Sequence, residues 1–479
     1  MTRKSFLLAC GVAAALFGNV AARAENLIEV YQDAVRSDPI VREAEARRAA
    51  ALEVKPQARA LLLPQVDIQG QYATRDSDGE TIFNQRFDPD NDPTTDNSVV
   101  LPVPNKQSSE SDFWNYTAGI TQSLFRWDQW QALKRADAEV AVAEANYRAA
   151  QQNLLVRVSR AYFDVLAAED TLAAAEATFE ALTRQLEQAE KRFEVGLIAV
   201  TDVQESRAAH DNATAGVIAA KRALATAQEA LRELTGENYQ ALVKPAEDMP
   251  LDQPKPAIEQ EWVDLALQNN LDVVAARLGT EVASGNVKVA RAGHYPTLEL
   301  FAQRNEFDSD ATQTNNGLTG PADASQTQDT IGVQLIVPIY SGGATQSRVR
   351  EQVHLHRAAR EKLEGTMRAA ERETRDAYLG VIAEKARVAA LRQAVKSSQT
   401  ALEATEAGFE VGTRTTVDVL DARRRLFEAQ RDYARSRYDY LINIVRLESA
   451  AGGLKQEDLA AINGYLTDPT TLPTVRPKT

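Results

Sequence analysis

The chain has 479 residues, 44% of them hydrophobic and 25% charged, and its 54 Lys and Arg against 68 Asp and Glu give a formal charge of -14. This apolar content is enough for a large core and argues against intrinsic disorder. The acidic excess, with no Lys/Arg cluster standing apart from acidic residues, argues against nucleic acid as a partner.

The first 24 residues have the features of a secretory signal peptide. Two basic residues precede an apolar run (6–17), and Ala22-Arg23-Ala24 fits a cleavage site before Glu25. The alternative is a lipoprotein signal lipidated on Cys10, but it leaves only about five apolar residues ahead of the cysteine. We therefore expect an exported mature chain without cysteine, which excludes disulfides and thiolate metal sites.

Four segments alternate apolar and polar residues in the manner of strands with one apolar face. They begin at Val66, Trp114, Leu298 and Ile331. Each is about the 9 to 11 residues that cross a bilayer as a tilted strand, whereas no later segment has the 18 or more apolar residues of a membrane helix. A half-buried sheet in a soluble domain is the alternative. Four strands cannot close a barrel and open edges are not tolerated in lipid, so a chain that spans with them must oligomerise.

Two long spans without proline favour long helices. They lie between Pro104 and Pro245 and between Pro338 and Pro469. In the first, small or apolar residues recur at alternating steps of three and four, which predicts a helix from Trp130 to Val195 of about 100 Å.

A glycine follows each of the long helical patterns. Gly196 and Gly412 stand where the helices would stop, because glycine accepts the left-handed conformation after a helix end. A second helical pattern follows each glycine, so each half is predicted to hold a long helical hairpin with Gly196 or Gly412 at its turn.

The two halves are copies of each other. RFEVGLIAVTDVQESR (192–207) recurs as GFEVGTRTTVDVLDAR (408–423), at an offset of 216 residues. Pro64 and Pro296 keep an offset of 232, so the first half holds about 16 extra residues, which we expect to be loop within the polar stretch 75–112. The chain thus divides into a signal peptide (1–24), a first repeat (25–235), a proline-rich linker (236–257), a second repeat (258–452) and a C-terminal segment (453–479).

The run VGTRTTVDVLDARRRLFEAQ, which begins at residue 411, together with LLPQVDIQGQY, RFEVGLIAVTDVQ and VPIYSGG (337–343), resembles the TolC family of outer-membrane exit ducts. The resemblance covers nearly the whole mature chain. It implies a mainly α protein with β structure, in which long antiparallel helical hairpins form a trimeric α-barrel. Four transmembrane strands per chain would contribute to a 12-stranded barrel.

The resemblance also implies a place and partners for the chain. It would be a homotrimer in the lipid of the cell outer membrane, extending into the periplasm. There it would dock to a periplasmic adaptor (membrane fusion protein) and an inner-membrane transporter. Its function would be that of a passive exit duct in multidrug efflux or type I protein secretion, gated at its periplasmic helical end.

Two acidic residues match carboxylates that line the periplasmic entrance in this family. Asp418 and Asp421 lie three apart on one face at the start of the last long helix. In a trimer they would form two rings of charge that favour cations. The alternative explanation is the helix dipole, which stabilises acidic residues at a helix start by about 0.3 to 1 kcal/mol.

A second group of residues matches the latch that holds the family's entrance closed. The resemblance makes Arg414 the donor and Thr201 and Asp202 the acceptors. Phe409 stands where the family often has a tyrosine, so that hydroxyl cannot take part here. The alternative is that Arg414 is a solvated loop charge, worth about 0 to 1 kcal/mol in an exposed pair.

The sequence does not favour an enzyme. It contains no glycine-rich phosphate loop, nucleophile elbow or zinc-type spacing, and His354 and His356 are two residues apart and so do not share a helix face. We therefore expect no catalytic residue, cofactor or metal site. The remaining alternative is a wholly periplasmic coiled-coil adaptor or tether without a membrane barrel, which leaves the four amphipathic segments unexplained.

Overall fold

The computed structural model describes residues 24–87, 89, 99–246 and 249–467. The predicted signal peptide apart from Ala24, including Cys10, and the end of the C-terminal segment lie outside the described residues. The chain forms two compact units, and each contains segments of both halves. The first unit comprises the chain up to Ala50, residues 141–278 and the chain from residue 360; the second comprises residues 51–140 and 279–359.

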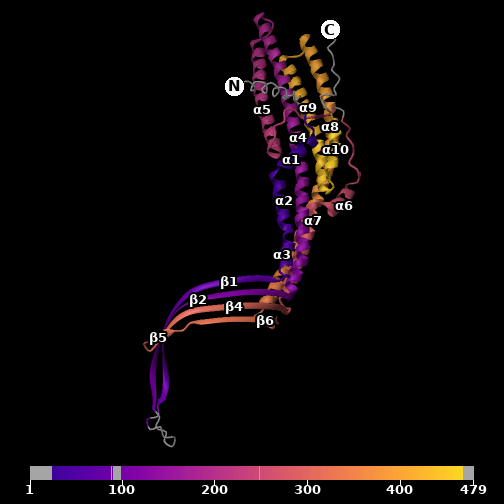
Figure 1. Ribbon diagram of the computed structural model, residues 1–479. Helices are drawn as coiled ribbons and strands as arrows, with labels where there is room; N and C mark the ends of the chain where they lie inside the picture. The colour runs from indigo at the N-terminus through magenta and orange to yellow at the C-terminus, as the bar shows by residue number, and fades with distance from the viewer. Residues whose placement is uncertain (1–23, 88, 90–98, 247–248, 468–479) are drawn as a thin grey trace, which may run out of the picture. The chain divides into compact units, whose positions relative to one another are not determined.

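The elements of the first half recur in the same order in the second half (Figure 1). Short helices come first, then antiparallel strands, then two long helices. The first half contains α1 (Leu27–Ser37), α2 (Pro39–Leu52), α3 (Val54–Ala60), β1 (Gln65–Phe87), β2 (Val99–Phe125), α4 (Trp127–Glu194) and α5 (Val200–Thr235). The second half contains α6 (Glu259–Asn269), α7 (Leu271–Ala292), β4 (Thr297–Asn315), β5 (Leu318–Pro321), β6 (Ala324–Ile336), α8 (Ala344–Glu410) and α9 (Thr416–Ala450). Between and after them lie β3 (Lys244–Pro245), α10 (Gln456–Asn463) and β7 (Leu466–Thr467).

The helices α4 and α8 are the longest elements, with 68 and 67 residues. At about 1.5 Å per residue each extends about 100 Å. The proline-free periodic pattern predicted the first of them from Trp130 to Val195, and the prediction of long helices is confirmed. No helix among the described residues combines the length and apolar character needed to cross a membrane.

The core of the first unit lies where α4 and α9 pack together. Tyr162 of α4 and Tyr438 of α9 are almost completely buried, so their hydroxyl groups need partners. Tyr162 donates to the carbonyl of Val243 at 2.7 Å, and Tyr438 donates to Oδ2 of Asp170 at 2.6 Å. Asp170, on α4, also accepts from Nζ of Lys244 on β3 at 2.7 Å. Its carboxylate therefore links this short strand to α4 and, through Tyr438, to α9.

The second unit contains an antiparallel sheet in which β2 and β4 are central. β1 pairs with β2, and β5 and β6 both pair with β4. The predicted loop at 75–112 is wrong: β1 and β2 pair without interruption from Gln65 opposite Thr121 to Phe87 opposite Val99. The predicted strand length is also too short, because these strands have 23 and 27 residues. An antiparallel ladder satisfies the backbone groups of both strands whatever the side chains, so polar residues extend it.

One face of this sheet carries a band of exposed apolar side chains. Residues directly opposite each other share a face, and Val66, Ile120, Ala302 and Ile331 form one row across the four strands. The other exposed members of the band are Ile68, Tyr72, Trp114, Tyr116, Leu300, Val333 and Leu335. An exposed apolar face of this kind is what a lipid-facing strand presents.

Aromatic residues mark one end of the apolar band. The rings of Tyr72 and Trp114 are 4.6 Å apart, and those of Trp114 and Tyr116 are 6.1 Å apart. Aromatic girdles at the edges of an apolar band are typical of strands at a membrane–water interface. We call Tyr72, Trp114 and Tyr116 the aromatic rim.

Candidate functional site

The candidate site lies at the tips of the two helical hairpins, in the first unit. Gly196 follows α4 with a φ of 76°, and Gly412 follows α8 with a φ of 79°. Both values are in the left-handed region, which glycine enters without strain. The Gly196 N–H donates to the Phe193 carbonyl at 2.8 Å, and the Gly412 N–H donates to the Phe409 carbonyl at 3.1 Å. The same turn therefore ends the first long helix of each hairpin.

The predicted site residues Asp202 and Asp418 hold the starts of the second helices. Asp202 accepts from the backbone N–H of Ala199 at 3.2 Å. Asp418 accepts from the N–H of Thr415 at 2.9 Å and from its hydroxyl at 3.0 Å. These hydrogen bonds hold the pKa of Asp418 below its ordinary value, and the nearby charge of Arg414 adds to the effect.

Asp421 lies one turn further along α9 and is engaged within its own helix. Its carboxylate forms ion pairs with Arg424 and, at 2.7 Å, with Arg425. Both arginine side chains are largely exposed. The two candidate entrance carboxylates thus have different surroundings, since Asp418 is held by backbone and hydroxyl donors and Asp421 by cations.

Arg414 lies beside Gly408 at the second tip. A methyl group on Gly408 would be 2.8 Å from Cγ of Arg414, so the glycine makes room for the arginine stem. Within the described chain, the guanidinium of Arg414 is not hydrogen-bonded to Thr201 or Asp202. A single copy of the chain therefore does not bring the three candidate latch residues together.

Phe409 connects the two hairpins through a residue that the sequence analysis did not identify. The guanidinium carbon of Arg192, on α4, lies 5.3 Å from the centre of the Phe409 ring on α8. This distance is typical of a cation–π contact. The repeat counterpart of Arg192 is Gly408, so only the first hairpin carries the cation.

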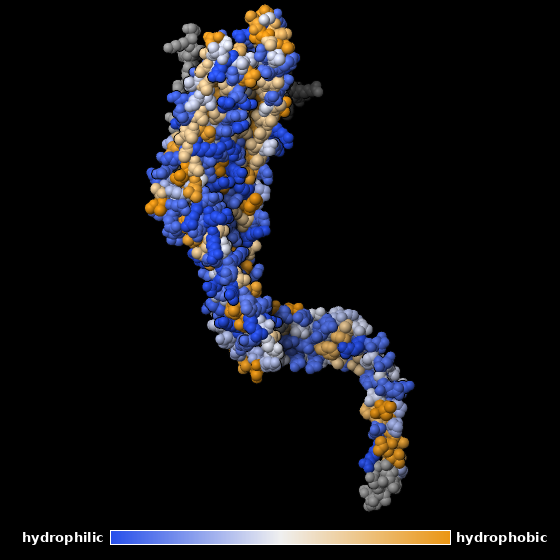
Figure 2. All heavy atoms as spheres, turned by 180° about the vertical axis from the view of Figure 1, so that it is seen from behind, coloured by the Kyte–Doolittle hydropathy of each residue, from blue (hydrophilic) through white to orange (hydrophobic). Residues whose placement is uncertain are grey.

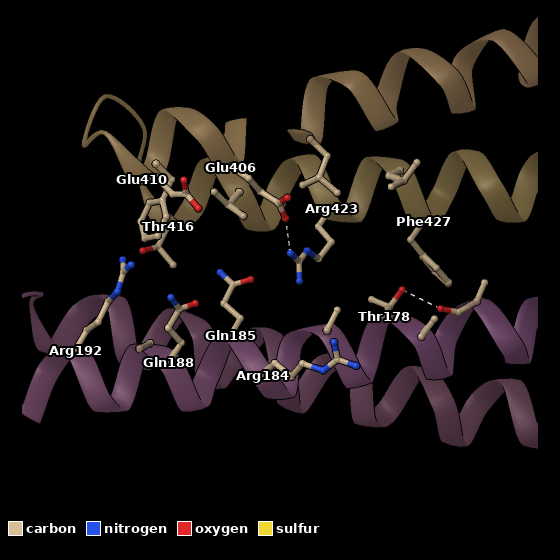
Figure 3. Close-up of a pocket in the computed structure, with 18 of the residues that line it drawn as sticks. Thr178, Arg184, Gln185, Gln188, Arg192, Glu406, Glu410, Thr416, Arg423 and Phe427 are labelled. Carbon is tan, nitrogen blue, oxygen red and sulfur yellow. Dashed lines mark hydrogen bonds and ion pairs between the residues drawn. The ribbon is translucent and has the colours of Figure 1, made fainter. Parts of the chain in front are cut away.

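A cavity of about 530 Å³ lies between the hairpins near these residues. Figure 3 shows polar side chains from both hairpins directed into it, with Arg192 and Gln188 from the first and Glu410 and Glu406 from the second. The lining therefore contains both charged groups and amides.

An ion pair recurs in both hairpins at the same offset. Glu190 and Arg207 join α4 to α5 at 2.8 Å, and Glu406 and Arg423 join α8 to α9 at 2.5 Å. Figure 3 shows the second pair at the cavity. The duplicated arginine was visible in the sequence, but its glutamate partner lies 17 residues away on another helix. Within the described ranges, no three His, Cys, Asp or Glu residues form a group that could hold a metal ion.

The chain matches the family model described as outer membrane efflux protein over residues 30–237 and 262–453. It is 35% identical to the outer membrane protein TolC of Vibrio cholerae, with 92% of this chain and 94% of that protein covered. It is 27% identical to the alkaline protease secretion protein AprF of Pseudomonas aeruginosa, with 91% and 86% covered.

Solved structures of outer membrane channels have the same fold. The CmeC channel of Campylobacter jejuni superposes with a TM-score of 0.69 at 17% identity, covering 92% of this chain and 90% of that one. VceC of Vibrio cholerae gives a TM-score of 0.68 at 22% identity, covering 89% and 96%.

Proposed function

The chain belongs to the outer membrane efflux protein family, and we propose that it is the passive exit duct of a tripartite export system. It is an outer-membrane efflux or secretion channel of the TolC type, a transport protein and not an enzyme. The observation that carries the proposal is the match over almost the full chain, joined to duplicated long hairpins and a sheet with an apolar outer face.

The working unit in this proposal is a homotrimer. A single chain has a sheet with open edges at β1 and β6, which lipid does not tolerate. Three copies, each giving four long strands, would close a 12-stranded barrel wide enough for an aqueous lumen. The long hairpins of the three copies would continue the passage as an α-barrel through the periplasm.

A passive duct needs partners that supply energy and cargo. We propose that a periplasmic adaptor and an inner-membrane transporter dock to the hairpin end. Relatives of this chain include proteins named for protease secretion and for antibiotic efflux. The cargo proposed here is accordingly a secreted protein or a small toxic molecule.

The proposed gate is a latch between neighbouring copies. Arg414 of one copy would donate to Thr201 and Asp202 of the next in the closed state. Support comes from Arg414, which is exposed at the second tip and whose guanidinium is not hydrogen-bonded to either residue within one described chain. Phe409 adds no hydroxyl to this latch, but its contact with Arg192 ties the two hairpins of one chain together.

The proposed selectivity site consists of Asp418 and Asp421. Three copies would set two rings of three carboxylates in the entrance, where low-dielectric walls strengthen their field. The hydrogen bonds from Thr415 hold the pKa of Asp418 below its ordinary value within one chain, which favours the charged form of this carboxylate.

Native mass measurement of the full chain extracted from outer membranes tests the assembly, and planar bilayer recording tests the channel. We expect a trimer that conducts ions. In the producing cell, deletion should sensitise growth to exported toxins or abolish secretion of a protein. A soluble monomer without channel activity would instead support the periplasmic adaptor.

A further inference from the structure

The strands β1 and β2 continue as a separate ribbon beyond the rest of the sheet (Figure 1). The last pairing of β2 with β4 joins Gln107 to Asn315. Lys106 still exchanges two hydrogen bonds with Asn316. Beyond it, β1 and β2 pair only with each other, from Thr81 opposite Asn105 to Phe87 opposite Val99. A two-stranded hairpin alone in water is at best marginally stable. The ribbon therefore needs a surface to pack against.

The ribbon stands far from the apolar band of the sheet. At about 3.3 Å per residue, Phe83 lies about 36 Å along β1 from Tyr72 of the aromatic rim. Most residues between them are polar, and Asp76, Asp78 and Glu80 are acidic. If the aromatic rim marks the membrane surface, the ribbon is outside the bilayer.

The apolar side chains of the ribbon lie on the opposite face from those of the band. In the band, exposed apolar residues of β1 and β2 occupy even positions, such as Val66 and Ile120. In the ribbon, Phe83 faces Val103 across the strands, and Phe87 faces Val99. The exposed fractions of this face are 56% for Phe83, 57% for Phe87, 50% for Val99, 49% for Leu101 and 38% for Val103. We call these five residues the ribbon face.

The other face of the ribbon is mixed. Ile82 and Val100 are exposed there beside polar Asn84 and Arg86. Pro102 and Pro104 are exposed on this face as well, so apolar side chains lie on both faces. Both aromatic rings of the described ribbon, Phe83 and Phe87, lie on the ribbon face. Figure 2 shows hydrophobic residues along this part of the molecule.

The ribbon face is continuous with the polar side of the sheet. That side carries Gln69, Gln71, Asn115 and Thr117, and the Thr117 hydroxyl donates to Asn305 at 3.0 Å. In the proposed trimer this is the side turned toward the lumen, because the apolar band must face lipid. The residues of the ribbon face have the same parity along the strands as this side, so the ribbon face continues the lumen side of the sheet up to the point where the ribbon turns away from the other strands (Figure 1).

From this placement we propose that the three ribbons of a trimer pack their ribbon faces against one another across the outer mouth of the channel. Each ribbon face is thus covered by another copy of this chain. The inference rests on the proposed trimer. Threefold symmetry brings three identical apolar faces together, and burying them supplies the packing that an isolated ribbon lacks.

The prolines of β2 favour contact through the face over pairing at the strand edge. Pro102 and Pro104 have no N–H to donate, and proline in a sheet is typical of edge strands. Such residues oppose the addition of another strand. The packed ribbons would narrow the exit, so cargo would pass only when they separate.

Disulfide trapping tests the contact. In a Cys10→Ser background, Phe83→Cys is compared with Asn84→Cys, its neighbour on the opposite face. After mild oxidation of intact cells, we expect at least tenfold more covalent dimer from Phe83→Cys. Equal yields from the two variants, in samples whose native mass is a trimer, would overturn the inference. A native mass that is not a trimer would show instead that the proposed assembly fails.

Two further measurements distinguish lipid from another copy of the chain as the surface that covers the ribbon face, and test whether the ribbons narrow the channel exit. If the ribbon face lay on outer-leaflet lipid, a fluorophore on the Phe83→Cys variant would be quenched by nitroxide-labelled lipids, and this result would overturn the inference. The double variant Leu101→Asp with Val103→Asp should raise single-channel conductance at least twofold, whereas Asn84→Asp, on the mixed face, should leave it unchanged. Parental conductance in a double variant that assembles as a trimer would contradict the narrowing.

Discussion

The two hairpin tips of this chain are built on one plan and differ in a few side chains. Both end their first helix at a left-handed glycine, Gly196 or Gly412. Both begin their second helix with a carboxylate that accepts backbone hydrogen bonds, Asp202 or Asp418. Both join their helices by the same glutamate–arginine pair. The features that the two repeats share are therefore those that form a helical hairpin.

The differences between the tips concern residues that a hairpin does not need. Arg192 in the first repeat is Gly408 in the second, and Ile198 is Arg414. At these two positions, each tip therefore carries an arginine that the other lacks. Since the fold is the same without them, these arginines indicate where the two tips have different tasks, and the proposed latch assigns the donor to the second tip alone.

Removing the donor should produce the largest effect. Arg414→Ser is expected to raise single-channel conductance and to sensitise cells to large antibiotics such as vancomycin. Three equivalent links act together, and each 1.4 kcal/mol lost shifts a closed–open equilibrium by about tenfold. Asp202→Ala should act similarly, and the double variant should add little.

Two controls sharpen this comparison. Lys191→Ser removes an exposed cation from the first tip and should leave conductance unchanged. Asp202→Asn keeps an oxygen that can accept from the N–H of Ala199 while removing the charge, so it separates loss of the latch charge from loss of the helix start. If Arg414→Ser and Asp202→Ala both conduct like the parent at matched expression, the two residues do not form the latch.

Neutralising the entrance carboxylates should have a smaller, measurable effect on ion selectivity. Asp418→Asn with Asp421→Asn is expected to reduce cation selectivity in planar bilayers. Because the folded pKa of Asp418 is lowered, its charge and its stabilising hydrogen bonds persist below the ordinary pKa of about 3.9 and are lost only as the pH falls through the lowered value. Thr415→Ala removes a donor and should move this loss to higher pH. Reversal potentials recorded between pH 7 and pH 3 check both expectations, and unchanged values in the double variant would contradict the role.

The helix starts offer a test at the level of local stability. Thr415 accepts from the N–H of Asp418 at 3.2 Å, whereas its counterpart Ala199 has no side-chain oxygen. Thr415→Ala should destabilise the start of α9 by about 1 kcal/mol, and Ala199→Thr should stabilise the start of α5 by less than about 1 kcal/mol. Hydrogen exchange of the first-turn amides measures both. Equal exchange in parent and variants would show that the caps contribute nothing.

The smallest expected effect concerns the duplicated ion pair. The Arg423 side chain is 23% exposed, whereas that of Arg207 is 51% exposed. Double-mutant cycles by hydrogen exchange should give a coupling near the upper end of about 0.2 to 1 kcal/mol for Arg423 with Glu406, and near the lower end for Arg207 with Glu190. A larger coupling in the first hairpin would reverse this ranking.

The sequence was most informative where its pattern was regular. Steps of three and four without proline predicted α4, the second span without proline predicted α8, and the offset of 216 predicted that the second tip copies the first. The extended pairing of β1 and β2 was missed because residues 75–112 are rich in Asp, Asn, Ser and Pro, and their few apolar residues do not alternate regularly with polar ones. The contact of Arg192 with Phe409 was missed because it joins two helices far apart in sequence, and Arg192 has no counterpart in the second repeat.

The hydrogen bond from Tyr438 to Asp170 has a consequence for the order of folding. It joins residues 268 positions apart, and the side chain of Gln152 reaches the carbonyl of Leu454 across 302 positions. Contacts so distant in sequence require closure of long loops and form late. The core around Tyr162 therefore cannot be completed until α9 and the residues that follow it have been synthesised. For nearly the whole of its translation the chain lacks a closed core, and in that state a secretion machinery can thread it.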